Sequence, residues 1–278
     1  DHFRAAGLDP ENPPKTWDEV LEYTKKLNLT DENGEPTQVG FSTVWWEIAP
    51  WTMGWTFGAD YWDADGNPTL DTPEMLEALN YVKELTAVVG EDAFQKLYDA
   101  SMATGVSPFT NGTVSMCIQF NGFCSTLETY APDLDYGVAL IPTKDGVNYK
   151  SSWGAGYGLE FTLKRDARAQ AAFELGQYLV STEVATKFLL GNSEYVCNME
   201  AYENPQIQND PIWQVFAESG KYTRIHHFCP ELPTWPNSVL VPEWQSALLG
   251  TKTPEQALAD AQANLLQEIE NYHLINGD

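Results

Sequence analysis

The chain has 278 residues, and its 15 Lys and Arg against 40 Asp and Glu give a formal net charge of −25. This acidity argues against a nucleic acid or an anionic membrane surface as a partner, because both are bound chiefly through Lys and Arg. Hydrophobic residues make up 43% of the sequence and charged residues 20%, which suits a folded protein of one large or two ordinary domains. No run of eighteen apolar residues occurs, so no transmembrane helix is predicted.

The first half of the chain is predicted to begin with a capped helix. Thr16 and Glu19 form a capping box before a helix that ends near Leu27. Val39 to Val44 reads as a strand that leads into a loop rich in tryptophan. A further helix begins at Pro73, because proline at the first helical position loses no hydrogen bond. We also predict helices at 92–102 and 124–130, strands at 114–120 and 136–141, and an extended Gly-rich segment at 153–163.

The second half is predicted to be mainly helical. One helix covers 167–180, with Ala169, Ala172, Phe173, Leu175 and Leu179 facing inward. Further helices are expected at 182–190 and 241–249, and the last helix begins after a capping box at Thr253. Strands mixed with helices in this order predict an α/β chain.

Cysteine and histidine content predicts neither a disulfide framework nor a metal site. His226, His227 and Cys229 lie close in sequence, but a zinc site needs a further pair of ligands at short spacing. No metal and no cofactor is therefore predicted. Four cysteines are too sparse to define a fold of this size, and their pairing stays open: Cys117, Cys124, Cys197 and Cys229.

Aromatic residues give the strongest chemical signal. Five of the ten tryptophans fall within eighteen positions: Trp45, Trp46, Trp51, Trp55 and Trp62. Indole rings stack on flat apolar faces, such as those of sugar rings, and donate a hydrogen bond from their edge. The cluster predicts a ligand-binding role, while any single member can equally be a core residue.

Catalytic motifs are missing from the sequence. Carboxylates are so abundant that a glycosidase-like pair, such as Glu47 with Glu160 or Asp135, is not singled out by any spacing. Nucleophile motifs built on Ser or Cys are absent, as is a nucleotide-binding loop. A secreted carbohydrate-active hydrolase stays open as an alternative, on the aromatic cluster and the carboxylates alone.

Five segments, in order, resemble one family. They are Phe3 to Glu19, Asn111 to Phe123, Trp153 to Gly158, Ala171 to Ser181 and Thr253 to Leu258. These segments are similar to the extracellular solute-binding proteins of ABC importers, family 1, the carbohydrate-binding group related to maltose-binding protein. The resemblance implies a periplasmic-binding-protein-like type II fold of two α/β lobes with the first lobe incomplete. Residues 1–150 plus 204–278 would form the C-terminal-type ligand-binding lobe, and 151–203 a remnant of the other.

The resemblance also implies a function. The chain would be a non-enzymatic extracellular or periplasmic receptor that captures a sugar or oligosaccharide between its lobes and delivers it to the permease subunits of an ABC importer. It looks mature or truncated at Asp1, so a signal region or membrane lipid anchor would belong to a missing N-terminal part. Such an incomplete chain is expected to be less stable than its parent and to associate. A non-sugar ligand stays open, since the scaffold does not set the ligand.

Site residues follow from the resemblance by position. Aromatic rings would stack on the sugar, and Glu47 and Asn121 would bond to hydroxyls. The Gly-rich strand would let the ligand approach the backbone. The predicted ligand contacts are Trp45, Trp46, Glu47, Trp51, Asn121, Phe123, Trp153, Tyr157 and Trp235.

Overall fold

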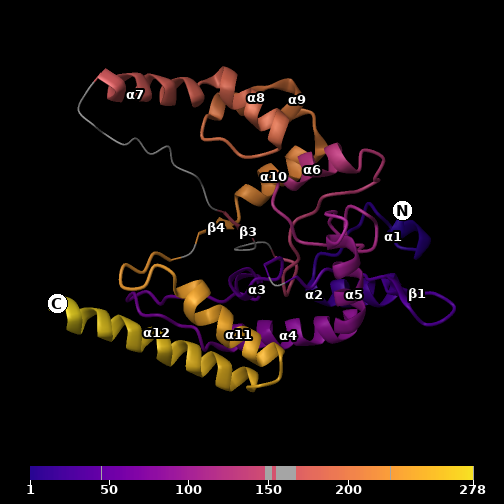
Figure 1. Cartoon of the computed structure of the whole chain (residues 1–278), viewed down its shortest axis with the longest axis horizontal. Helices are drawn as coiled ribbons and strands as arrows, with labels where there is room; N and C mark the ends of the chain where they lie inside the picture. Colours follow the sequence, from indigo (N-terminus) through magenta and orange to yellow (C-terminus); the bar gives the residue numbers. More distant parts are fainter. Residues whose placement is uncertain (45, 148–151, 155–166, 226, 278) are drawn as a thin grey trace. The chain divides into compact units, whose positions relative to one another are not determined.

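Helices account for most of the ordered backbone in Figure 1. This computed structural model describes residues 1–44, 46–147, 152–154, 167–225 and 227–277. The chain separates into two compact units: unit 1 comprises 1–118, 140–153 and 222–278, and unit 2 comprises 119–139 and 154–221. The lobe boundaries expected from the resemblance stay a prediction.

Unit 1 begins with α1 (His2–Ala5) and the capped helix α2 (Trp17–Leu27). The Thr16 hydroxyl accepts the amide of Glu19 at 3.2 Å, and the Glu19 carboxylate accepts the amide of Thr16 at 3.1 Å. These bonds satisfy two amides that a helix start leaves without partners. The predicted helix and its capping box are confirmed.

Helices α3 (Pro50–Thr56), α4 (Pro73–Val89) and α5 (Glu91–Met102) follow in unit 1. The Thr72 hydroxyl caps α4 by accepting the amide of Met75 at 3.3 Å. Apolar residues at helical spacing place one side of α4 in the core, where Leu79, Val82 and Leu85 are fully buried. The helices predicted from Pro73 and at 92–102 are confirmed.

The C-terminal part of unit 1 contains η2 (Pro236–Leu240), which is π-helical, α11 (Val241–Leu248) and α12 (Pro254–Asn276). Thr253 caps α12, because its hydroxyl accepts the amide of Gln256 at 3.2 Å. The buried face of α12 packs on α11 and α4 (Figure 1). Both helices predicted here are confirmed.

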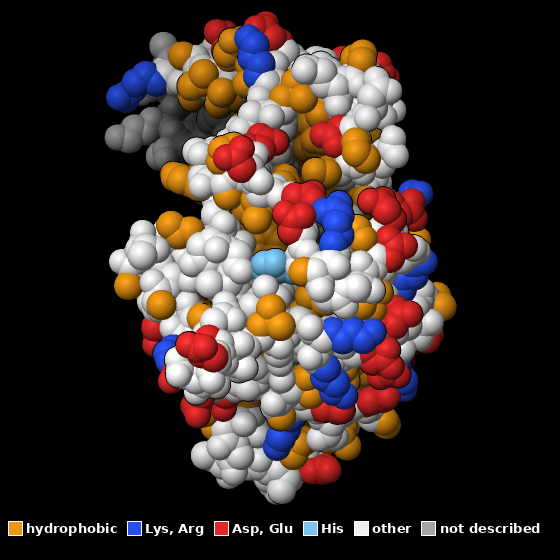
Figure 2. All heavy atoms as spheres, turned by 90° about the vertical axis from the view of Figure 1, so that its right-hand side faces the viewer, with side chains coloured by type: hydrophobic (Ala, Val, Ile, Leu, Met, Phe, Trp, Pro, Cys, Tyr) orange, Lys and Arg blue, Asp and Glu red, His pale blue; other side chains and the backbone are white. Residues whose placement is uncertain are grey.

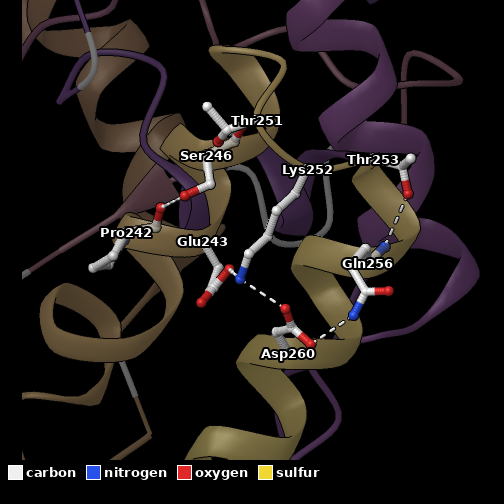
Figure 3. Close-up of polar contacts among 8 residues, drawn as sticks. All are labelled: Pro242, Glu243, Ser246, Thr251, Lys252, Thr253, Gln256 and Asp260. Atoms are coloured by element: carbon white, nitrogen blue, oxygen red, sulfur yellow. Dashed lines mark hydrogen bonds and ion pairs between the residues drawn. The ribbon is translucent and has the colours of Figure 1, made fainter.

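A polar cluster links α11 to α12. Figure 3 shows the Lys252 ammonium between the carboxylates of Glu243 on α11 and Asp260 on α12, with 2.7 Å to the Asp260 oxygen. Hydrogen bonds to Asp260 and Glu243 raise the pKa of Lys252. The amide of Gln256 donates to the other Asp260 oxygen at 2.7 Å. The cluster therefore ties the connection between the two helices to both of them.

Sheets are small in the described residues. Strands β1 (Leu29–Thr30) and β2 (Pro36–Gln38) pair antiparallel, and β3 (Ser152–Trp153) and β4 (Thr223–Arg224) pair parallel. The strands predicted at 39–44, 114–120 and 136–141 are wrong as regular strands. Segments 39–42 and 113–116 nevertheless run in parallel, with the Ser42 amide donating to the Met116 carbonyl at 2.9 Å and a bridge between Val39 and Val114. Such a short ladder leaves extended backbone without a continuous strand.

Unit 2 is an assembly of short helices. They are α6 (Phe123–Tyr130), α7 (Ala167–Leu179), α8 (Thr182–Asn192), the 3-10 helix η1 (Met199–Glu203), α9 (Pro205–Gln208) and α10 (Pro211–Gly220). The helices predicted at 124–130, 167–180 and 182–190 are confirmed. Their common core is small: Ala185, Leu189, Ala201, Ile207 and Trp213.

The inward face predicted for α7 is wrong. Phe173, Leu175 and Leu179 are all exposed, Leu175 to 57%. The spacing of apolar residues shows which side of a helix is apolar, but burial also needs a surface to pack against. Helix α7 contacts α8, but this contact leaves Phe173, Leu175 and Leu179 largely exposed.

Figure 2 shows Lys and Arg side chains spread among Asp and Glu on the face in view, without one large basic patch there. In the described ranges no helix has both the length and the apolar character to cross a membrane. The four cysteines are free thiols: Cys117, Cys124, Cys197 and Cys229.

Candidate ligand-binding site

The tryptophan-rich segment of unit 1 precedes and enters α3. Trp45 lies outside the described residues, and Trp46 is 45% exposed. Glu47 and Trp51 are buried, and Trp51 belongs to the core of unit 1. Of the two tryptophans described here, Trp46 therefore presents the accessible aromatic surface.

Trp235 lies at the start of η2 and is only 1% exposed. Its ring centroid is 5.8 Å from that of Tyr61 and 5.0 Å from that of Trp62, and its indole nitrogen donates to the His227 carbonyl at 3.2 Å. Trp62 in turn stacks on the His227 ring at 4.5 Å. Trp235 thus holds this aromatic group together from within the core, and its contact with a ligand stays a prediction.

Glu47 lies near Cys117 in unit 1. Burial raises the pKa of the Cys117 thiol, and the Glu47 carboxylate raises it further. Because the thiolate is the reactive form of cysteine, this environment makes Cys117 an inert residue at neutral pH. The surroundings of Glu47 therefore do not create a nucleophile.

Asn121 and Phe123 belong to unit 2, where the chain turns into α6. The Asn121 side-chain amide donates to the Ser193 carbonyl. Partial burial raises the pKa of the neighbouring Glu194 carboxyl, while a hydrogen bond from Asn121 lowers it. Sequence reasoning did not single out Glu194, because no local spacing connects it to Asn121, whose partner Ser193 is already 72 positions away.

Trp46, Glu47, Trp51 and Trp235 thus belong to unit 1, and Asn121 and Phe123 belong to unit 2. The backbone of Trp153 forms part of β3, opposite Arg224, but its side chain and Tyr157 lie outside the described residues.

Two surface hollows of unit 1 lie away from these residues. One, of about 180 Å³, is lined by Lys83, Thr86, Ala87, Glu91 and Leu248. The other, of about 190 Å³, is lined by His2, Ala5, Ala6, Lys26, Leu29 and Gln38. No group of three His, Cys, Asp or Glu side chains in the described part of the chain is arranged to hold a metal ion.

Residues 1–186 match the bacterial extracellular solute-binding protein family. The chain belongs to this family. Members bind solutes and are not enzymes, which agrees with the lack of catalytic motifs, and the family is extracellular or periplasmic. The resemblance to solute-binding proteins of family 1 is confirmed.

Curated relatives carry different ligand names. The sn-glycerol-3-phosphate-binding periplasmic protein UgpB of Salmonella paratyphi A is 26% identical over 291 residues, covering 94% of this chain and 61% of that protein. A probable amino-acid ABC transporter periplasmic-binding protein of Sinorhizobium fredii, y4oP, is 33% identical, covering 95% and 59%. The chain thus spans about three fifths of the length of these relatives.

Solved structures share the fold. CpMnBP1 with mannotriose bound is 25% identical, with a TM-score of 0.76 over 97% of this chain and 68% of that one. The maltose/maltodextrin-binding domain MalE of Bdellovibrio bacteriovorus, bound to maltotriose, is 23% identical with a TM-score of 0.74, covering 93% and 67%. The chain therefore has the periplasmic-binding-protein fold over about two thirds of these proteins, with mainly helical described residues.

Proposed function

We propose that this chain is the ligand-binding part of a carbohydrate receptor that captures a sugar or oligosaccharide and delivers it to an ABC importer. The observation that carries the proposal is the likeness to the mannotriose-bound CpMnBP1, at 25% identity over nearly the whole chain. Membership of the solute-binding family supports the transport role.

The aromatic content supports a sugar over the other ligands named among the relatives. Trp46 and Trp62 keep part of their surface accessible in unit 1, and aromatic faces suit the apolar faces of sugar rings. An anionic ligand such as a phosphate ester would meet a chain with a formal net charge of −25 and would gain little from long-range attraction.

The arrangement proposed for the receptor is the one expected from the resemblance. Two lobes of the type II fold would close over the ligand, residues 1–150 plus 204–278 forming one and 151–203 part of the other. Hinge closure is a common motion of two-lobed binding proteins. Permease subunits would be the partner, and a lipid anchor in the whole protein would hold the receptor at the membrane.

Calorimetric titration tests this function. The chain would be titrated with mannotriose, maltotriose and sn-glycerol 3-phosphate, and the sugar solutions would be assayed afterwards for cleavage. Saturable heat with a sugar that stays intact is the expected result. Heat with glycerol 3-phosphate alone, or no heat with any probe, would overturn the carbohydrate receptor, and cleavage of the sugar would move the assignment to a hydrolase.

A further inference from the structure

A carboxylate and an aromatic ring converge on Gly122 in unit 2. A Cβ atom added at this glycine would lie 2.2 Å from a carboxylate oxygen of Glu194 and 3.2 Å from the Cε2 atom of Phe120. A Cβ atom at 2.2 Å would force the Glu194 side chain to move, so the missing side chain of Gly122 makes room for the carboxylate in its present position. Phe120 is 59% exposed, which leaves much of its ring open beside these groups.

Asn121 completes the group. Its side-chain amide donates to the Ser193 carbonyl and to the Glu194 carboxylate. These two bonds orient the side chain and use its N–H donors, so the groups offered from Asn121 and Glu194 are oxygen acceptors. Acceptors beside an open aromatic ring match a ligand that has O–H donors and an apolar C–H face.

The loop that presents Glu194 is fixed from both sides. Ser193 has a φ of 54°, and among the described residues no other residue except glycine has a positive φ. The amide of Ser193 donates to the Leu189 carbonyl at 3.0 Å. The Tyr195 hydroxyl donates to the Phe216 carbonyl at 2.6 Å. Ser193 is the left-handed C-cap that ends α8, so the end of this helix sets the position of Glu194.

We propose that Phe120, Asn121 and Glu194 form a monosaccharide subsite that selects a neutral polyhydroxylated ligand over a phosphate ester. This inference rests on the proposed carbohydrate-binding function and names the residues of unit 2 that set its specificity. The ring of Phe120 stacks on the sugar, and the carboxylate and amide oxygens accept hydrogen bonds from adjacent hydroxyls. A phosphate group would be repelled by Glu194. The fixed loop lowers the ordering cost of binding.

Two variants test the subsite by calorimetry with mannotriose. Glu194→Gln keeps the shape but removes the charge, and a hydrogen bond to a charged group is worth enough to weaken binding about 10-fold or more. Phe120→Ala is expected to weaken it about 3-fold or more through lost stacking. Gly122→Ala, which displaces the carboxylate but keeps its charge, is expected to act in the same direction as Glu194→Gln.

Matched controls come from the same unit. Glu203→Gln changes an exposed carboxylate away from the group, and Phe173→Ala removes an exposed ring of α7; both are expected to bind mannotriose as the wild type does. Circular dichroism melts verify that each variant is folded.

The outcomes separate the two proposals. If the wild type binds mannotriose and both Glu194→Gln and Phe120→Ala bind it equally well, the subsite is wrong and the carbohydrate receptor stands. If the wild type binds sn-glycerol 3-phosphate more tightly than any sugar, the selectivity assigned to Glu194 is wrong. If it binds neither, both proposals fail.

Discussion

Unit 1 and unit 2 contain helices of similar sequence character that end up in very different environments. In unit 1, α4 buries its apolar side among α2, α3 and α12. In unit 2, α7 also carries large apolar side chains, yet Phe173, Leu175 and Leu179 are exposed. The difference teaches that periodicity determines the orientation of a helix only where a second surface is present to receive it.

The largest change in stability is expected when one buried indole is removed from each unit. Trp17 is buried in unit 1, where its ring nitrogen donates to the Thr56 hydroxyl at 2.8 Å, and Trp17→Ala is expected to lower the free energy of unfolding by about 3–5 kcal/mol. Trp213→Ala, in the small core of unit 2, is expected to lower the free energy of unfolding by less than Trp17→Ala does. Urea unfolding followed by circular dichroism measures both, and equal losses would contradict the comparison.

A glycine from each unit tests how closely the backbone is packed. A Cβ at Gly40 would lie 2.6 Å from the Cα atom of Thr24, whereas one at Gly191 in α8 would have no atom within 4 Å. Gly40→Ala should destabilise the chain by about 1–3 kcal/mol, because backbone atoms must move. Gly191→Ala should stabilise it by about 0.5–1 kcal/mol, because glycine is unfavourable inside a helix. Thermal melts that gave both changes the same sign would be inconsistent with this packing.

Helix caps give a smaller difference between the units. The Thr16 hydroxyl caps α2, but the Ser181 side chain makes no capping hydrogen bond at the start of α8. Thr16→Ala is expected to cost about 1 kcal/mol, and Ser181→Ala to stay within about 0.5 kcal/mol. Denaturant titration of the two variants would detect the contrast, and an equal cost at both caps would refute it.

The smallest change in stability is expected on the surface of α7. Replacing Phe173 and Leu175 by Gln should alter the free energy of unfolding by less than about 0.5 kcal/mol. The same change should reduce self-association, since exposed apolar patches promote contact between molecules. Sedimentation velocity at several concentrations compares the wild type with the variant. A wild type that stays monomeric throughout would show that this surface does not drive association.

Local signals were read correctly from the sequence. The caps at Thr16 and Thr253 and the proline at position 73 place helix starts because these signals act within one turn. The strand predicted at 114–120 was wrong because pairing depends on distant backbone, here near Val39. Asn121 was predicted as a ligand contact from the resemblance of its segment to the family, and that role stays a prediction. Glu194 was not, because only folding brings it to Gly122.

One consequence concerns spectroscopy. Trp213 is the single tryptophan within the spans of unit 2, and the nine others belong to unit 1. Its ring lies 6.0 Å from that of Tyr195, the residue after Glu194. The emission removed by Trp213→Phe is therefore the signal of unit 2 alone, and it originates next to the loop that presents Glu194. The difference between the spectra of the wild type and Trp213→Phe therefore follows events in unit 2 separately from the tryptophans of unit 1.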